Sequence, residues 1–293
     1  MQLPDTRRLP AVLIAGLAGL GILLAGQAMA STLEVFHADS LAGPMQALKK
    51  AFEAKHQGVA INLTSGVSKQ LAERILKGEI CDVYAPSSPA VIEEDLMHKR
   101  IAGSGIEAAS WYVVFSANEM VVITQKGNPL GIRRVIDLAK PEVRLARVTG
   151  EKDLATNRTI EFLRKAAALE GRPELAQKII DGAVTDPSKP NTVPETIRAV
   201  KEGRANAGVV YYSAAIAARN ELDIIRFPAN VNLSDTIRNA ASVPGTAANA
   251  KAAMDFVNLL LSAEGQNILK DTGQPPVVPA IRKGDPAVSA MSR

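Results

Sequence analysis

Three hydroxyl side chains lie where a predicted strand gives way to a predicted helix. Ser40 and Ser68 each follow a short apolar segment, and Tyr211 lies near the end of a third. The start of a helix presents unpaired backbone N–H groups and the positive end of the helix dipole, so it suits an anion. Serine and tyrosine hydroxyls add hydrogen-bond donors without adding charge. The set therefore predicts a site for an oxyanion that has no proton to donate.

Each of these residues also has an ordinary structural interpretation. Serine is a preferred helix N-cap, so Ser40 and Ser68 could simply cap their helices. Tyr211 could be a core aromatic residue whose hydroxyl is satisfied locally. The three residues recur at corresponding strand ends, where ligands of open α/β sheets bind, and this recurrence favours the binding interpretation.

Strand and helix patterns alternate along the chain, which predicts an α/β fold with parallel strands and crossover helices. Strands are predicted at 32–38, 59–63, 82–85, 111–115, 120–124, 143–148, 207–212 and 222–227. Helices between and after them are indicated by apolar residues at spacings of three and four. The tail from residue 272 is rich in proline and is predicted to lie over the surface without regular structure. No linker rich in Gly or Ser divides the chain.

Residues 1–30 have the pattern of a cleaved signal peptide. Arg7 and Arg8 precede the uncharged apolar run 11–26, and Ala28-Met29-Ala30 forms a small-x-small cleavage site. The apolar run is short for a membrane span. The mature protein is therefore predicted to be soluble, exported and periplasmic.

Composition excludes several classes of function. The net charge of +4 is spread along 293 residues and aromatic residues make up only 4%, so no nucleic-acid partner is expected. Cys81 is the single cysteine, which rules out a disulfide framework and a cysteine-rich metal site. No P-loop, dinucleotide fingerprint or zinc-protease motif occurs, and no cofactor is predicted.

An enzyme is the other class of protein that these hydroxyl residues could indicate. A serine hydrolase is the alternative, with Ser68 as nucleophile. The segment 66–70 lacks the final glycine of a nucleophile elbow, and His37, His56 and His98 are the only histidines. The chain is therefore predicted not to be an enzyme.

The chain resembles the periplasmic molybdate-binding proteins of ABC transporters over essentially its whole mature length. The residues that carry this resemblance are Val35–Leu41, Gly66–Ile75, Asp82–Ala85 and Gly208–Tyr211. The resemblance implies a monomer with a two-lobed solute-binding fold, each lobe a mostly parallel sheet flanked by helices. Lobe one is expected at 31–114 plus 228–293 and lobe two at 115–227, with two short hinge crossings between them.

The resemblance also implies a set of ligand-binding residues. Ser40, Ser68 and Tyr211 would donate their hydroxyls, and Val193 would donate a backbone N–H. A further donor from lobe two is expected within 153–157, and Asp153 is the ligand-binding residue predicted there. The ligand would be molybdate or tungstate, and the partner an ABC transporter permease.

Carboxylates near the predicted site set this chain apart from the family pattern. Asp39 stands where that family usually has Ala or Gly, and a carboxylate would repel an oxyanion unless His37 or Lys69 neutralises it. Archaeal-type tungstate/molybdate binders, which the chain also resembles, can place a metal-coordinating carboxylate at the position of Asp153. Sulfate, phosphate, a carboxylate or a ferric ion remain alternative ligands.

Overall fold

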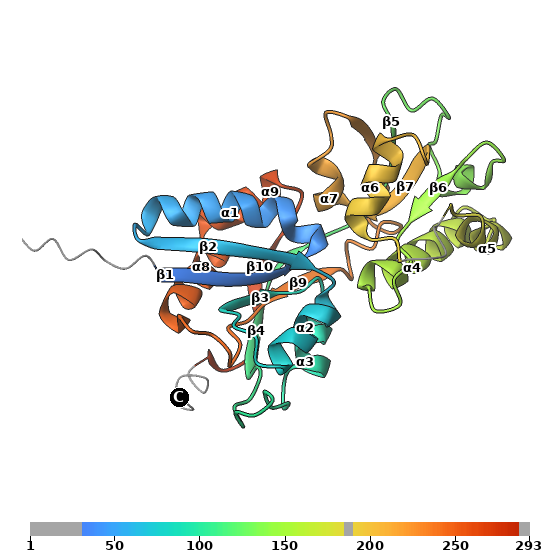
Figure 1. Ribbon diagram of the computed structural model, residues 1–293. Coiled ribbons are helices and arrows are strands. Elements are labelled where there is room, and N and C mark those ends of the chain that lie inside the picture. The colour runs from blue at the N-terminus through green and yellow to red at the C-terminus, as the bar shows by residue number, and fades with distance from the viewer. Residues whose placement is uncertain (1–30, 185–189, 287–293) are drawn as a thin grey trace, which may run out of the picture.

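The computed structural model describes residues 31–184 and 190–286. The chain forms two α/β lobes side by side, each with its own sheets and helices (Figure 1). The predicted signal peptide, residues 1–30, lies outside the described residues. Within the described part, no helix is both long and apolar enough to cross a membrane.

A parallel three-stranded sheet lies at the centre of the first lobe. Strand β1 (Ser31–Ala38) lies between β2 (Val59–Gly66) and β3 (Val83–Ala85). The helices that follow these strands are α1 (Ala42–Lys55), α2 (Ser68–Leu76) and α3 (Pro89–Asp95), and a 3₁₀ turn, η1 (Asp39–Leu41), precedes α1. This half of the lobe confirms the predicted alternation of parallel strands and helices.

A second, antiparallel sheet completes the first lobe from distant parts of the chain. Strand β4 (Trp111–Ala117) pairs with β9 (Arg238–Ala241) on one side and with β10 (Pro276–Gly284) on the other. Helices α8 (Ala250–Leu261) and α9 (Ala263–Asp271) lie between β9 and β10 in sequence. They contribute Phe256, Leu260 and Leu269 to the core of this lobe.

The prediction of an irregular tail was wrong, because residues 276–284 form β10. The strand lies at the edge of its sheet, where proline is tolerated, and its pairing with β4 is interrupted between Pro276 and Ile281. Most of its side chains are exposed, so it shows no alternation of buried and exposed residues in the sequence. The sequence of this segment therefore lacks the period-two pattern that predicts a strand.

The second lobe is built on a mixed sheet in the order β6-β7-β5-β8. Its strands are β5 (Met120–Gln125), β6 (Leu145–Arg147), β7 (Ala207–Tyr211) and β8 (Leu222–Ile225). Strand β5 is antiparallel to both of its neighbours, whereas β6 and β7 are parallel. The sheet of this lobe is therefore mixed, with β6 and β7 as its parallel pair.

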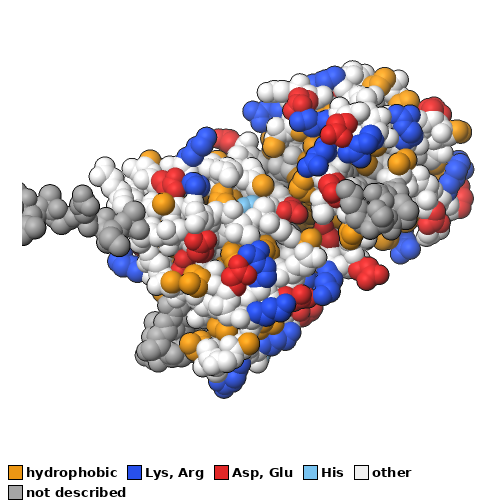
Figure 2. Space-filling model, viewed as in Figure 1, with side chains coloured by type: hydrophobic (Ala, Val, Ile, Leu, Met, Phe, Trp, Pro, Cys, Tyr) orange, Lys and Arg blue, Asp and Glu red, His pale blue; other side chains and the backbone are white. Residues whose placement is uncertain are grey.

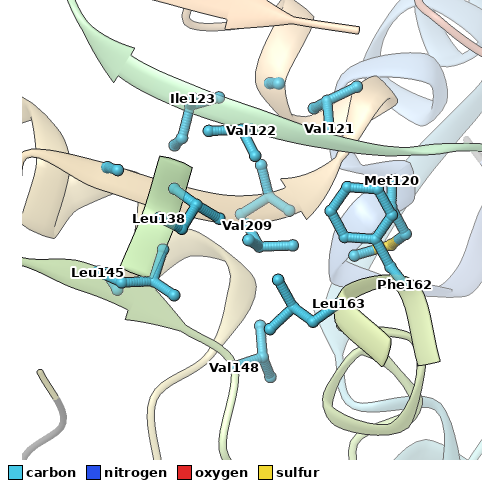
Figure 3. Packing of buried hydrophobic residues seen from close by; sticks show 14 of the residues in the cluster. Met120, Val121, Val122, Ile123, Leu138, Leu145, Val148, Phe162, Leu163 and Val209 are labelled. Carbon is cyan, nitrogen blue, oxygen red and sulfur yellow. The ribbon is translucent and has the colours of Figure 1, made fainter. Parts of the chain in front are cut away.

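Helices on both sides of this sheet enclose the core of the second lobe. They are α4 (Leu154–Leu169), α5 (Glu174–Asp181), α6 (Val193–Lys201) and the short α7 (Tyr212–Ile216), with a 3₁₀ segment, η2 (Val135–Ala139). Phe162 and Leu163 of α4 pack toward Met120 and Val209 of the sheet (Figure 3).

The connection between the lobes is short and buried. Asn118 and Glu119 are the only residues between β4 and β5, and both are almost fully buried. Glu119 accepts hydrogen bonds from Arg226 and from Asn232 Nδ2, which ties the outgoing crossing to the returning chain. The expected boundary between residues 114 and 115 falls within β4, whose pairing with β9 continues to Ala117, and the lobe boundaries stay a prediction.

Candidate functional site

The carboxyl ends of the three parallel strands meet at one edge of the first lobe. Ala38 lies opposite Gly66, and His37 lies opposite Ala85. A serine follows each strand within two residues, namely Ser40, Ser68 and Ser87. The fold therefore gathers three hydroxyls at the edge that faces the second lobe.

Ser40 does not act as a helix cap. It lies within η1, and neither η1 nor α1 has a side-chain capping bond. Its side chain is 2% exposed, and its Oγ has no hydrogen-bond partner among the described residues. A buried hydroxyl without a partner loses its hydrogen bonds to water, which costs roughly 1–3 kcal/mol. A ligand that accepts a hydrogen bond at this position would restore that loss.

Ser68 is held in place by its neighbours. It is the first residue of α2, so it is not the cap, which is Val67. The backbone N–H of Ser87 donates to Ser68 Oγ at 3.2 Å, and the Tyr84 hydroxyl donates to the Ser68 carbonyl at 2.6 Å. Since Ser68 Oγ already accepts one bond, its own proton is available to a further acceptor.

Tyr211 supplies a buried hydroxyl from the second lobe. It ends β7, is 2% exposed, and its Oη has no hydrogen-bond partner among the described residues. Burial raises the pKa of Tyr211, and the nearby Asp153 carboxyl raises it further. The Ser87 hydroxyl lies near the Tyr211 hydroxyl and lowers the pKa of Tyr211 slightly, which offsets part of the rise. The two hydroxyls do not meet the geometric criteria of a hydrogen bond. Tyr211 is therefore a protonated donor at neutral pH.

Val193 is the first residue of α6, so its backbone N–H has no partner within the helix. Thr192 and Glu195 form a capping box around it. The buried Val193 side chain and Asp39 line one cavity of about 470 Å³ between α1, α6 and α7. The amide predicted as a donor thus begins a helix that meets the first lobe.

Asp153 caps the helix that follows it and lies near the other carboxylate. Its Oδ1 accepts a hydrogen bond from Ala155 N at 2.9 Å at the start of α4. The pKa of Asp153 is raised to about 6, mainly by burial and in part by the Asp39 carboxyl, while the bond from Ala155 opposes the rise. The two carboxyls therefore lie close enough to interact across the lobe interface.

Neither predicted neutraliser forms an ion pair with Asp39 within the described part of the chain. Asp39 Oδ1 accepts from Ser65 Oγ at 2.6 Å. The His37 ring is 2% exposed and its Nδ1 lies 2.9 Å from the Ala38 carbonyl. Burial lowers the pKa of His37, so its ring is neutral at pH 7.

Two contacts hold the lobes together beside these residues. The Ser213 hydroxyl on α7 donates to the Ser40 carbonyl, and Lys152 pairs with Glu73 of α2 at 2.6 Å. Ser40 and Tyr211 therefore lie on opposite sides of one interface, since Ser213 is two residues from Tyr211. The structure thus brings Ser40, Ser68, Tyr211 and Asp153 to the same interlobe region.

Sequence reasoning missed Ser87. The segment Pro86-Ser87-Ser88-Pro89 looks like an ordinary turn, and Ser88 is indeed the cap of α3. The available signal was position, because Ser87 follows the third parallel strand just as Ser40 and Ser68 follow the first two.

The comparisons with known proteins agree on one family. A family model described as bacterial extracellular solute-binding protein matches residues 33–274. The molybdate-binding protein ModA of Mycobacterium tuberculosis is 25% identical over 275 residues, which cover 92% of this chain and 96% of that protein.

Solved structures share the fold. The periplasmic molybdate-binding protein of Azotobacter vinelandii has a TM-score of 0.60 and 19% identity, and the match covers 84% of this chain and 99% of the other. The sulfate-binding protein SubI of M. tuberculosis has a TM-score of 0.66 and 18% identity, with 89% and 90% covered. These neighbours are two-lobed periplasmic solute-binding proteins.

Proposed function

Because this chain belongs to the bacterial extracellular solute-binding protein family, we propose that it captures a tetrahedral oxyanion, molybdate or tungstate, between its lobes. It would then deliver the anion to the permease of an ABC transporter. The observation that carries the proposal is a pair of buried hydroxyls that find no hydrogen-bond partner in the described part of the chain, Ser40 from one lobe and Tyr211 from the other. The similarity to ModA proteins supports molybdate as the ligand.

The proposed binding sequence follows from where the donors lie. The open form takes the anion on Ser40 and Ser68 of lobe one. Closure then brings Tyr211 and the Val193 amide of lobe two onto the anion and excludes water. Hydrogen bonds to an ionised group are stronger than neutral ones, so the anion favours the closed form and shifts the population toward it. The permease would recognise that form.

The rest of the proposal concerns location and assembly. The signal-peptide pattern in residues 1–30 supports export to the periplasm, with cleavage after Ala30. Lobe one is proposed at 31–114 plus 228–293 and lobe two at 115–227, and the protein is proposed to act as a monomer. Figure 2 shows acidic and basic side chains interspersed over both lobes on one face, without a basic patch on that face.

Thermal unfolding with a panel of anions tests the choice of ligand. Molybdate and tungstate are expected to raise the unfolding midpoint more than sulfate or phosphate at equal concentration. A free anion concentration of about 100 times the Kd adds roughly 2.7 kcal/mol to the unfolding free energy, and a change of this size is readily measured. A larger shift with sulfate or phosphate would reassign the ligand, and no shift with any oxyanion would refute the proposal.

Affinity is expected to fall as the pH rises through about 6, the value to which burial raises the pKa of Asp153. A protonated carboxyl carries no charge beside the anion, whereas the carboxylate repels it. Asp153→Asn is neutral at every pH and still caps α4, because Asn is as good a cap as Asp. Calorimetric titrations between about pH 5 and pH 7.5 should show a several-fold fall for the wild type and a flatter profile for the variant.

The same pKa has an effect on folding with a defined sign. The unfolded Asp153 loses its proton near 3.8, while the folded one keeps it to about 6. The folded state therefore binds more protons in this window, and the contribution of Asp153 to stability falls as the pH rises through it. Asp153→Asn should remove that component from the pH dependence of urea unfolding. Identical pH profiles for both proteins, in binding and in unfolding, would contradict the role assigned to Asp153.

A further inference from the structure

We propose that the hydroxyl of Ser87 is a further donor to the bound oxyanion, placed between Ser68 of lobe one and Tyr211 of lobe two. The inference rests on the proposed function and adds a residue to that site. It assigns to the first lobe a third hydroxyl, so that each of its three parallel strands would contribute one.

Ser87 is held at the edge of the sheet by backbone contacts on both sides. Strand β3 ends at Ala85, opposite His37 of β1. The carbonyl of Pro86 accepts a hydrogen bond from Ala240 N at 3.3 Å, which ties this segment to β9. Ser87 is 8% exposed, so it is buried.

The contacts of Ser87 leave its hydroxyl proton uncommitted. Its backbone N–H donates to Ser68 Oγ at 3.2 Å, and this bond positions Ser68. Its own Oγ lies 3.4 Å from Ser68 Oγ, at the outer limit of hydrogen bonding. On the other side, Ser87 is close enough to Tyr211 to lower the pKa of the phenol. Ser87 is thus a buried hydroxyl with one weak contact, between two proposed ligand donors.

The chemistry of a hydroxyl suits a fully ionised tetrahedral anion. The O–H can rotate toward whichever oxygen of the anion lies nearest and donate to it. It brings no negative charge of its own, unlike Asp39 and Asp153. A further uncharged donor from lobe one would offset part of the repulsion from those two carboxyls.

Ser87→Ala tests the role of the hydroxyl alone, because the variant keeps the backbone N–H that positions Ser68. The matched control is Ser88→Ala. Ser88 is the adjacent serine, 9% exposed, and its Oγ accepts from Ala90 N as the cap of α3. Titration calorimetry with molybdate is done on wild type and on both variants, and the unfolding midpoint of each is measured without ligand.

We expect a roughly tenfold higher Kd for Ser87→Ala, because the variant loses one hydrogen bond to a charged group. Its ligand-free unfolding midpoint should match the wild type. Ser88→Ala should show the opposite pattern, with wild-type affinity and a lower midpoint from the lost cap. If Ser87→Ala fails to fold, Ser87→Cys keeps the size with a weaker donor and carries the same expectation.

Two outcomes overturn the inference and are distinguishable from each other. If the wild type binds molybdate and Ser87→Ala binds it equally well, or if both variants lose affinity alike, the role of Ser87 is wrong and the proposed function stands. If the wild type binds neither molybdate nor any other tetrahedral oxyanion, the proposed function fails and the role of Ser87 fails with it.

Discussion

Ser68→Ala and Tyr211→Phe are each expected to weaken oxyanion binding by about 1.5–3 kcal/mol, roughly ten- to a hundredfold in Kd. Each variant deletes one hydroxyl and leaves the rest of the side chain in place. The bond that is lost joins a neutral donor to an ionised group in a site from which closure excludes water, so it is worth more than an ordinary hydrogen bond.

Tyr211→Phe should also show a signature that general damage to the fold cannot imitate. Tyr211 Oη is buried and has no partner among the described residues, so removing it takes away an unsatisfied group. The ligand-free protein should therefore unfold at the same midpoint as the wild type or slightly higher, while its affinity falls.

Tyr112→Phe is the matched control for this variant. Tyr112 is 6% exposed and donates its hydroxyl to Glu93 on α3. Removing that hydroxyl breaks an existing bond, so stability should fall while affinity is kept. Titration calorimetry and thermal unfolding of the three variants give both readouts, and unchanged affinity in Ser68→Ala and Tyr211→Phe would remove these residues from the site.

Phe162→Ala is expected to lower the free energy of unfolding by about 3–5 kcal/mol. Phe162 is fully buried on α4 in the core of the second lobe, beside Leu163 and Met120 (Figure 3). Its ring meets that of Phe227 edge to face, with 5.4 Å between the ring centroids. Truncation would forfeit this packing and leave a cavity in a core that is otherwise filled.

Leu169→Ala is the control for Phe162→Ala. Leu169 is on the same helix but 55% exposed, so its replacement should change the unfolding free energy by less than about 0.5 kcal/mol. Urea unfolding, extrapolated to water, measures both variants. If both variants lost equally little unfolding free energy, Phe162 would not anchor α4 in the core of this lobe. The helix would then not fix the position of Asp153, which caps it.

The first half of lobe one could be predicted from the sequence because its signals are local. Strand β1 contains the apolar residues Leu33, Val35 and Phe36, and α1 and α2 have apolar residues at helical spacing. Their predicted positions therefore agree with the structure within a few residues. Strand β10 gave no such signal, because it contains prolines and its side chains are mostly exposed. Such a segment can form a strand only at the edge of a sheet, and its partner β4 lies far away in the sequence.

The part of the site that could be predicted is the part marked by hydroxyl residues at the ends of strands. Ser40, Ser68 and Tyr211 stood out as hydroxyls at strand ends, and the structure places them in one interlobe region. The cap interpretation of the two serines was wrong, since neither serine caps a helix here. The pairing of β3 with β1 puts Ser87 beside Ser68, so its position after the third strand becomes informative only once the order of the strands is known.

The antiparallel sheet of lobe one has a consequence for synthesis of the chain. A ribosome releases β4 long before β9 and β10, the two strands that pair with it. Both edges of β4 therefore stay open while the strands of lobe two emerge. The nascent protein holds β4 unpaired while residues 118–237 are made, and unpaired strand edges promote aggregation. A chain that terminates before residue 276 lacks β10 and keeps one of those edges open permanently, so residues 276–284 decide whether both edges of β4 are covered.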